Sequence, residues 1–361
     1  MKTIAFFNNK GGVGKTSLVY HLAWMLQRLG YRVLAVDLDP QANLSAMFLD
    51  EDTLWRILEN KRERSIYGAI SPLFRGVGDI AVNPHIEIRS EGLGLLVGDL
   101  GLAEVEDELS GTWPRCLSGE ERAFRVITAF ARLTANASRD FKADVVLVDL
   151  GPNLGSINRA ALVGCDHVII PLAPDLYSMQ GLRNMGPKVR QWQEDWEIRK
   201  LMATRSPIDV ELPEGGMAPL GYVAVKFSVL NQRPAKAFQY WLDEMPGQYR
   251  TWIVKNDTEA EPSIDEDPYC LAQIRDYKSL IPKSQTHYMP IFDLGRPHGV
   301  FGASADAAER CAEDFEQLAI RIVDRAEFAR PPAPVRLERS SAPPSLSARL
   351  NRLEKLVSKA S

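Results

Sequence analysis

Short apolar runs alternate along the chain with longer segments of helical periodicity. This alternation is typical of a mostly parallel β-sheet with helices on both faces, because a strand that is buried on both sides is apolar at nearly every position. The pattern therefore predicts a doubly wound α/β fold. We expect its strands at Lys2–Phe7, Arg32–Asp37, Leu93–Val97, Asp144–Leu150, His167–Leu172 and Gly221–Phe227.

Helix and loop signals divide the main domain, which we place at residues 1–328. The first helix should run from about Lys15 to Leu29, because Gly30 follows as a helix-ending glycine. Residues 50–120 are charged at first and then punctuated by Gly and Pro, which predicts short helices and loops that elaborate the same domain. Residues 207–219 have the composition of a surface loop.

The composition changes beyond Phe328. Residues 329–345 are rich in Pro and Ser and predict an extended linker. In residues 346–361 the apolar positions are spaced as on one stripe of a short amphipathic helix: Leu346, Leu350, Leu353 and Val357. Such a helix could lie on a membrane surface, dock a partner or stay mostly unfolded. The lack of Phe and Trp disfavours the membrane, and we favour partner docking.

Charge and composition restrict the function classes. The 361 residues carry a formal net charge of −4, so binding to nucleic acid or to an anionic membrane would need a local basic patch. The four cysteines form no C-x-x-C pair and the five histidines have no metal-ligand spacing, which favours buried thiols and structural histidines. No run approaches the ~20 apolar residues of a membrane span, and the first apolar stretch is too short for a signal peptide. We therefore expect a cytoplasmic protein.

A glycine-rich segment between the first strand and the first helix carries the clearest chemistry. Its glycines let successive N–H groups converge on a phosphate, and the helix N-terminus adds its dipole. Lys15 supplies a charge for the β- and γ-phosphates, and Thr16 offers a hydroxyl to Mg²⁺. The pattern is K-G-G-x-G-K-[ST], with Asn9 where the common phosphate loop has a glycine and with a second lysine, Lys10. The predicted ATP-binding residues are Gly11, Gly12, Val13, Gly14, Lys15, Thr16 and Ser17.

Acidic residues end two of the predicted strands. Asp37 and Asp39 follow the second strand, and Asp149 ends the strand at 144–150. A single acidic residue after a strand is usually a helix cap or a turn former. Two such strands beside a phosphate loop instead indicate carboxylates that hold Mg²⁺ and orient water.

These motifs resemble the ParA/MinD (Soj-like) family of P-loop ATPases, which have a deviant Walker A motif. The matches are K-G-G-x-G-K-[ST], then D-x-D-P-Q-x-N at 37–43 and D-x-G-P at 149–152. The resemblance implies a Mg²⁺-dependent ATPase that turns over slowly, dimerises when ATP is bound and is stimulated by a protein partner, ParB-like or other.

The resemblance also implies roles for individual residues. Lys10 would reach across the dimer interface to the phosphates of the partner subunit, and Asp39 would act on the attacking water. Asp37 and Asp149 would belong to the Mg²⁺ shell, each through water, and residues 151–153 would sense the γ-phosphate. A looser match at 280–291 places Pro282 at the adenine pocket. The resemblance covers residues 1–325 and is loose in 50–120 and 230–270.

One helical segment, residues 183–205, carries six basic residues interleaved with Trp192 and Trp196. Members of the resembled family often bind DNA non-specifically as ATP dimers, which would place the protein on the nucleoid. A solvated helix face with both Trp side chains packed inward explains the pattern slightly better.

The function we expect is a switch that partitions or positions DNA or another cargo. Two alternatives stay open. A metabolic or metal-cluster-maturation ATPase of the same superfamily would need a substrate pocket, for which residues 50–120 are the only large segment. A nucleotide-gated scaffold would bind ATP without hydrolysing it.

Overall fold

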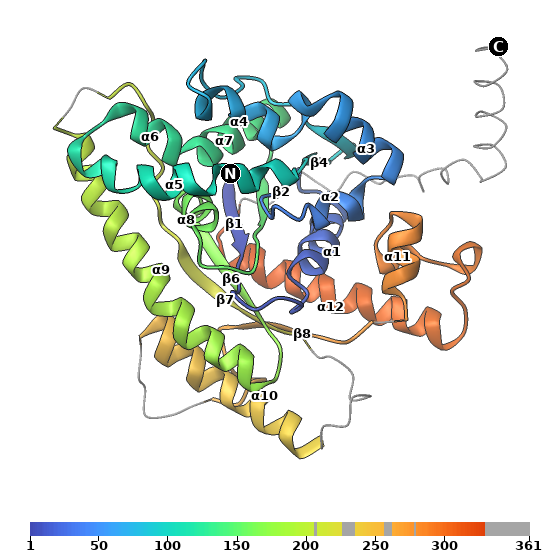
Figure 1. Cartoon of the computed structure of the whole chain (residues 1–361). Coiled ribbons are helices and arrows are strands. Elements are labelled where there is room, and N and C mark those ends of the chain that lie inside the picture. The colour runs from blue at the N-terminus through green and yellow to red at the C-terminus, as the bar shows by residue number, and fades with distance from the viewer. Residues whose placement is uncertain (206–207, 226–234, 256–261, 278, 329–361) are drawn as a thin grey trace, which may run out of the picture. The chain divides into compact units, whose positions relative to one another are not determined.

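The computed structural model describes residues 1–205, 208–225, 235–255, 262–277 and 279–328. Eight strands in this part of the chain form one sheet in the order β3-β4-β2-β5-β1-β6-β7-β8 (Figure 1). All neighbouring pairs are parallel except β3 with β4. The predicted doubly wound α/β fold is thereby confirmed.

Six of the strands lie where the apolar runs predicted them, within a few residues at each end. Two edge strands, β3 and β8, were not predicted. The strands are β1 Lys2–Phe6, β2 Val33–Asp37, β3 Glu87–Ser90, β4 Leu93–Leu96, β5 Val145–Asp149, β6 His167–Leu172, β7 Ala218–Val225 and β8 Cys270–Ile274.

Helices fill the connections between the strands and cover both faces of the sheet. The α-helices are α1 Lys15–Arg28, α2 Asn43–Phe48, α3 Glu51–Asn60, α4 Ile66–Phe74, α5 Glu106–Thr112, α6 Glu121–Ile127, α7 Ala129–Phe141, α8 Ser156–Val163, α9 Leu176–Ala203, α10 Ala235–Tyr249, α11 Ile281–His287 and α12 Ala303–Arg325. Short 3₁₀ turns lie at Arg62–Arg64, Leu100–Val105, Pro114–Ser118, Ile291–Asp293 and Arg296–His298, and a π-helical turn at Arg250–Val254.

Successive side chains of each central strand enter different cores, since they point to opposite faces of the sheet. In β1, Ile4 and Phe6 pack with α1, α2 and α12, while Ala5 and Phe7 pack on the side of α4 to α9. Figure 1 shows α9 running along one flank of the sheet with α10 packed against it. Because both faces are covered, ligands can reach the sheet only at its edges and at the ends of its strands.

The boundaries differ from the expectation in small ways. Helix α1 ends at Arg28 and Gly30 follows with φ +93°, so the glycine ends the helix as predicted. The loop before β7 is shorter than predicted, because β7 already begins at Ala218 and pairs with β6 from there. Residues 226 and 227, which we expected to continue this strand, lie outside the described residues.

The predicted elaboration at 50–120 consists of α3, α4, α5, the β3–β4 pair and 3₁₀ turns. The described part of the chain belongs to one compact unit, which is separate from residues 331–361. The predicted linker at 329–345 and the tail helix at 346–361 lie outside the described residues. Within the described part, no helix has both the length and the apolar character needed to cross a membrane.

Candidate functional site

The glycine-rich segment forms the turn between β1 and α1. Gly12 and Gly14 have φ of +74° and +83°, in the left-handed region that side chains disfavour, and Gly14 is the N-cap of α1. Asn8 is buried at the end of β1, where its Nδ2 donates to the Pro171 carbonyl at the end of β6. The loop is thus fixed to two adjacent strands at their carboxyl ends, where its N–H groups and the N-terminus of α1 can hold an anion.

Lys15 lies in the first turn of α1 and is 7% exposed. Its Nζ donates to the carbonyl oxygens of Asn8 at 3.2 Å and Lys10 at 3.4 Å. Burial lowers the pKa of Lys15, and the carboxylates of Asp149 and Asp39 oppose that shift. The ammonium therefore has backbone partners within the chain but no carboxylate close enough to form an ion pair among the described residues.

Two aspartates meet at the ends of adjacent strands. Asp37 on β2 and Asp149 on β5 are register partners, and both are fully buried. Burial raises the pKa of Asp37 to about 7, opposed by two hydrogen bonds from Ser45. Burial and the neighbouring charge of Asp37 raise the pKa of Asp149, while Thr16 and Lys15 oppose that rise.

Three carboxylate oxygens in this pair have no hydrogen-bond partner among the described residues: both of Asp149 and Oδ1 of Asp37. Buried acceptors are almost always paired in folded proteins, so these oxygens are suited to a bound cation or to the water around one. No group of three His, Cys, Asp or Glu side chains that could hold a metal by themselves occurs within the described part, this site included. Two carboxylates with free oxygens fit Mg²⁺, which is commonly held by one or two carboxylates together with substrate phosphates.

Asp39 follows the end of β2 by two residues and is 6% exposed. Its Oδ1 accepts from the Gln41 N–H at 3.0 Å and lies 3.4 Å from the position that a Cβ on Gly151 would take. Asn158 on α8 stabilises the turn at 151–153, because its Nδ2 donates to the carbonyls of Gly151 and Asn153 at 2.8 and 2.7 Å. Asp39 and the predicted switch residues thus lie next to each other.

Lys10, the second lysine of the motif, points away from the phosphate loop. Its ammonium is paired with the carboxylate of Asp175, the N-cap of α9, and lies 5.9 Å from the ring centroid of Tyr177. The Lys10 side chain is 26% exposed and is not part of the cavity wall. The ion-pair partner of Lys10, Asp175, therefore lies outside the nucleotide cavity of the same chain.

A cavity of about 740 Å³ lies beside the phosphate loop and is lined by Lys15 and Asp39, whereas Asp37, Asp149 and Lys10 are not part of its wall. It extends from the phosphate loop, Asp39 and Pro152 to a cleft between α2–α3 and α11. The cleft walls come from segments far apart in the chain: Ala46, Met47, Leu49 and Leu54 on one side and Ile281, Gln285, Thr286 and Tyr288 on the other. The cavity volume falls within the range of ordinary ligand pockets, ~300–1,000 Å³. The cavity is therefore large enough for a nucleoside triphosphate.

The structure brings together most of the predicted site residues. Gly11, Gly12, Gly14, Lys15, Thr16, Ser17 and Asp39 line the cavity, and Val13 is buried beneath the loop. Pro282 is exposed in the first turn of α11 and does not line the cavity, although its neighbour Ile281 does. The cleft residues of α2 and α3 were missed, because nothing in their sequence distinguishes them from ordinary apolar helix residues.

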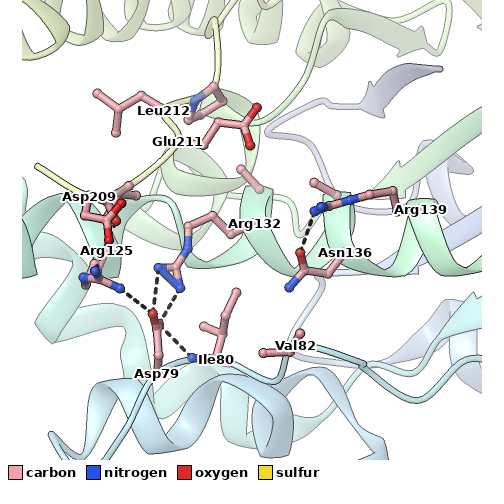
Figure 2. Close-up of a pocket in the computed structure, with 14 residues that line it drawn as sticks. Asp79, Ile80, Val82, Arg125, Arg132, Asn136, Arg139, Asp209, Glu211 and Leu212 are labelled. Atoms are coloured by element: carbon pink, nitrogen blue, oxygen red, sulfur yellow. Dashed lines mark hydrogen bonds and ion pairs between the residues drawn. The ribbon is translucent and has the colours of Figure 1, made fainter.

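A second cavity, of about 440 Å³, lies away from the phosphate loop (Figure 2). It is bounded by α6, α7 and residues 209–213, and its arginines are largely paired. Arg125 and Arg132 both bind Asp79, and Arg139 donates to Asn136. Among its described lining residues, no buried charged group lacks a partner in a way that would call for a ligand.

The basic residues on α9, for which DNA binding was the less favoured of two interpretations, are mostly engaged within the protein. Trp192 and Trp196 are buried, which confirms the inward packing that we favoured. Arg199 is 5% exposed, lies over the Trp113 ring and donates to the Trp113 carbonyl. Arg190 donates to the Trp252 carbonyl, and Lys200 forms an ion pair with Glu197.

Comparison with known proteins agrees with the geometry. The family model described as an AAA domain matches residues 1–202. Protein IncC of Escherichia coli is 31% identical over 214 residues, and the chromosome partitioning protein ParA of Caulobacter vibrioides is 28% identical over 186 residues. These matches cover 59% and 51% of this chain but only 52% and 61% of the two relatives. The chain thus spans little more than half the length of the curated relatives it matches.

Two solved structures extend the likeness over most of the chain. Protein DIP2308 from Corynebacterium diphtheriae is 26% identical, with a TM-score of 0.63, covering 90% of this chain and 98% of that one. An ATP complex of McdA from Cyanothece has a TM-score of 0.56 at 17% identity, covering 91% of this chain and 97% of that one. At that identity the second likeness shows the fold alone.

Proposed function

Because the chain belongs to the ParA/MinD family of P-loop ATPases, we propose that it binds Mg²⁺ and ATP, closes into a two-fold dimer and hydrolyses ATP to ADP and phosphate. The cycle would partition or position DNA or another cargo. The observation that carries the proposal is the set of buried, unpaired carboxylate oxygens on Asp37 and Asp149 beside Lys15 and the phosphate loop.

Each part of the cavity has a role in binding ATP. The loop N–H groups and Lys15 hold the phosphates, because a buried ammonium without a carboxylate partner favours a polyanion. The Thr16 hydroxyl, Asp37 and Asp149 are the groups that fit Mg²⁺, which supplies charge neutralisation for the phosphates. The adenine base of ATP would bind in the cleft between α2–α3 and α11, where it would pack against apolar side chains.

Hydrolysis is assigned to Asp39. Its carboxylate lines the cavity and is oriented by the Gln41 N–H, so it can accept a hydrogen bond from a water aimed at the γ-phosphate. Phosphoryl transfer depends mainly on positioning and charge stabilisation, so Asp39 need not be a strong base. The turn at 151–153 lies beside Asp39 and is suited to change position when the γ-phosphate leaves.

Lys10 is assigned to the dimer. Its ammonium lies outside the cavity of its own chain, against Asp175 and Tyr177 at the protein surface, which supports a role toward a second subunit. In the dimer, the phosphates of the partner would replace Asp175 as its counter-ion. The ion pair with Asp175 would then hold Lys10 in place between cycles.

Partners beyond the homodimer belong to the same proposal. Slow turnover that is raised by a ParB-like or other protein suits a switch better than a metabolic enzyme. DNA binding by α9 has less support in the single subunit, because Arg190, Arg199 and Lys200 are already bonded. The metabolic alternative loses its main support as well, since the cavity beside residues 79–82 contains arginines paired with Asp79.

Sedimentation velocity of the full chain with Mg²⁺ and ATP tests the proposal. We expect the wild type and Asp39→Ala to form dimers, with the Asp39 variant trapped in that state. Lys10→Ala should bind ATP but remain monomeric, while the exposed-lysine control Lys142→Ala should behave as wild type. Normal dimerisation of Lys10→Ala would show that the cross-subunit role is wrong. Phosphate release, measured with and without DNA, separates the switch from a scaffold that does not hydrolyse ATP.

A further inference from the structure

Ser45 on α2 makes three contacts at the edge of the nucleotide site. It is fully buried, eight positions after Asp37. Its hydroxyl donates to Asp37 Oδ2 at 2.7 Å, and its backbone N–H donates to the same oxygen at 2.8 Å. Its Oγ in turn accepts from the Gly98 N–H at 2.8 Å. One short side chain thereby joins β2, α2 and the segment that follows β4.

These contacts restrict the orientation of the Asp37 carboxylate. Two donors on Oδ2 leave Oδ1 as the oxygen without a partner, and Oδ1 belongs to the same group of unpaired oxygens as Asp149. Gly98 lies on the other side: a Cβ there would lie 2.8 Å from Asp37 Cγ and Oδ2. Gly98 therefore leaves room for Asp37 that any other residue would fill, and the carboxylate cannot rotate without losing both bonds from Ser45.

We propose that Ser45 is a positioning residue, which holds Asp37 so that Oδ1 faces the Mg²⁺ that accompanies bound ATP. The inference rests on the proposed function and assigns Ser45 a part in metal affinity. Partners of this kind orient the groups around a metal, and their loss typically lowers metal affinity by about 10- to 100-fold. Because Asp37 is expected to act through water, we expect the lower end of that range.

The support for Ser45 continues into the 50–120 elaboration. Gly98 precedes Asp99, whose carboxylate accepts from the Ser65 hydroxyl at 2.6 Å, the Gly101 N–H at 2.7 Å and Arg62 at 3.1 Å. These bonds fix the segment after β4 and so fix the Gly98 N–H that holds Ser45. The elaboration is thus connected to the metal side of the site through Asp99, Gly98 and Ser45.

A simpler explanation is that Ser45 only satisfies the buried Gly98 N–H. That explanation predicts a less stable protein when the hydroxyl is removed, but no change in how strongly Mg²⁺ favours nucleotide binding. The positioning role predicts a change in this Mg²⁺ dependence. The two explanations therefore differ in a quantity that can be measured apart from stability and from activity.

The test is a fluorescence titration of the full chain with a labelled nonhydrolysable ATP analogue, in EDTA and in Mg²⁺. The ratio of the two dissociation constants reports how strongly Mg²⁺ favours binding. We expect Ser45→Ala to lower this ratio by about tenfold while the dissociation constant in EDTA stays within about twofold of wild type. Ser45→Cys, which keeps a similar size but donates poorly, should show the same loss if the alanine variant does not fold.

Ser138→Ala is the matched control, because Ser138 is also a buried helical serine but its hydroxyl has no hydrogen-bond partner among the described residues. Its ratio should equal that of the wild type. An unchanged ratio in the Ser45 variants, including one in which both dissociation constants rise together, overturns the positioning role while leaving the proposed function intact. A wild-type protein that binds no nucleotide overturns both.

Discussion

The carboxyl ends of β1, β2 and β5 and the arginine-lined cavity of Figure 2 both gather charged side chains, but their charges are compensated differently. In the Figure 2 cavity, Asp79 is bound by two arginines and is 38% exposed. At the strand ends, Asp149 is fully buried and neither of its oxygens has a hydrogen-bond partner in the part of the chain that the structure describes.

This difference in charge compensation indicates which of the two regions binds a ligand. Burying a charge without a partner costs stability, and a fold retains such a cost mainly where a bound group removes it. Asp79 and its arginines need nothing further, so they connect α6 and α7 to the segment after α4. Asp149 and Lys15 have no ion-pair partner among the residues that the structure describes, and Mg²⁺ with a triphosphate would supply one to each.

The largest effect is expected at Lys15. Lys15→Ala should weaken binding of a nonhydrolysable ATP analogue by about 100-fold, because charge-assisted contacts to two phosphates, each worth about 1.5 kcal/mol or more, are lost. Isothermal titration calorimetry measures this directly. Lys142→Ala serves as the control, and an affinity for Lys15→Ala within a few fold of wild type would remove Lys15 from the phosphate site.

Asp39→Ala should act on the chemical step. We expect the rate of phosphate release to fall by about 100-fold, because a positioned carboxylate that orients the attacking water is lost. ATP binding should stay close to wild type, since in the proposed role Asp39 would contact the attacking water and not the phosphates. The exposed Asp140→Ala is the control, and an undiminished rate for Asp39→Ala would assign hydrolysis to another group.

Asp149→Asn should make the nucleotide-free protein more stable. Because burial raises the pKa of Asp149, folding at neutral pH must either bury its charge or bind a proton. The amide of Asn avoids both costs, so we expect the free energy of unfolding to rise by about 1 kcal/mol. Chemical denaturation in EDTA at neutral pH gives this value, and the same variant should lose the Mg²⁺ dependence of nucleotide binding. A large loss of stability would mean that the carboxylate has a partner within the protein.

The same substitution at Asp79 sharpens the comparison. Asp79→Asn weakens two ion pairs that are partly open to solvent, so the free energy of unfolding should fall by at most about 1 kcal/mol. Nucleotide binding should not change. A clear change in ATP affinity would show that the arginine-lined cavity communicates with the nucleotide site.

The sequence predicted the central sheet and the phosphate loop because both depend on local signals. Continuous apolar runs identify strands that are buried on both faces, and glycines at positive φ identify the loop. The edge strand β8 is buried and mostly apolar, and it was missed although it carries the same signal as the central strands. The edge strand β3 escaped detection for a physical reason. Residues 87–90 are half-exposed and mostly polar, so their pairing with β4 depends on tertiary contacts more than on their own pattern.

The missed parts of the site are contacts between distant segments. The cleft between α2–α3 and α11 joins residues near 50 with residues near 285, and no periodicity reports such a meeting. Ser45 resembles any serine near a helix start until its bonds to Asp37 and Gly98 are known. The partner of Lys10, Asp175, is also 165 residues away in the chain.

The most direct test is a crystal structure of the protein grown with Mg²⁺ and a nonhydrolysable ATP analogue. We predict the triphosphate in the loop at 11–17, a Mg²⁺ ion on the side of Asp37 and Asp149, and Lys10 of a second protomer at the phosphates. A cavity that stays empty at saturating nucleotide, or a filled cavity with no second protomer at its mouth, would contradict the account.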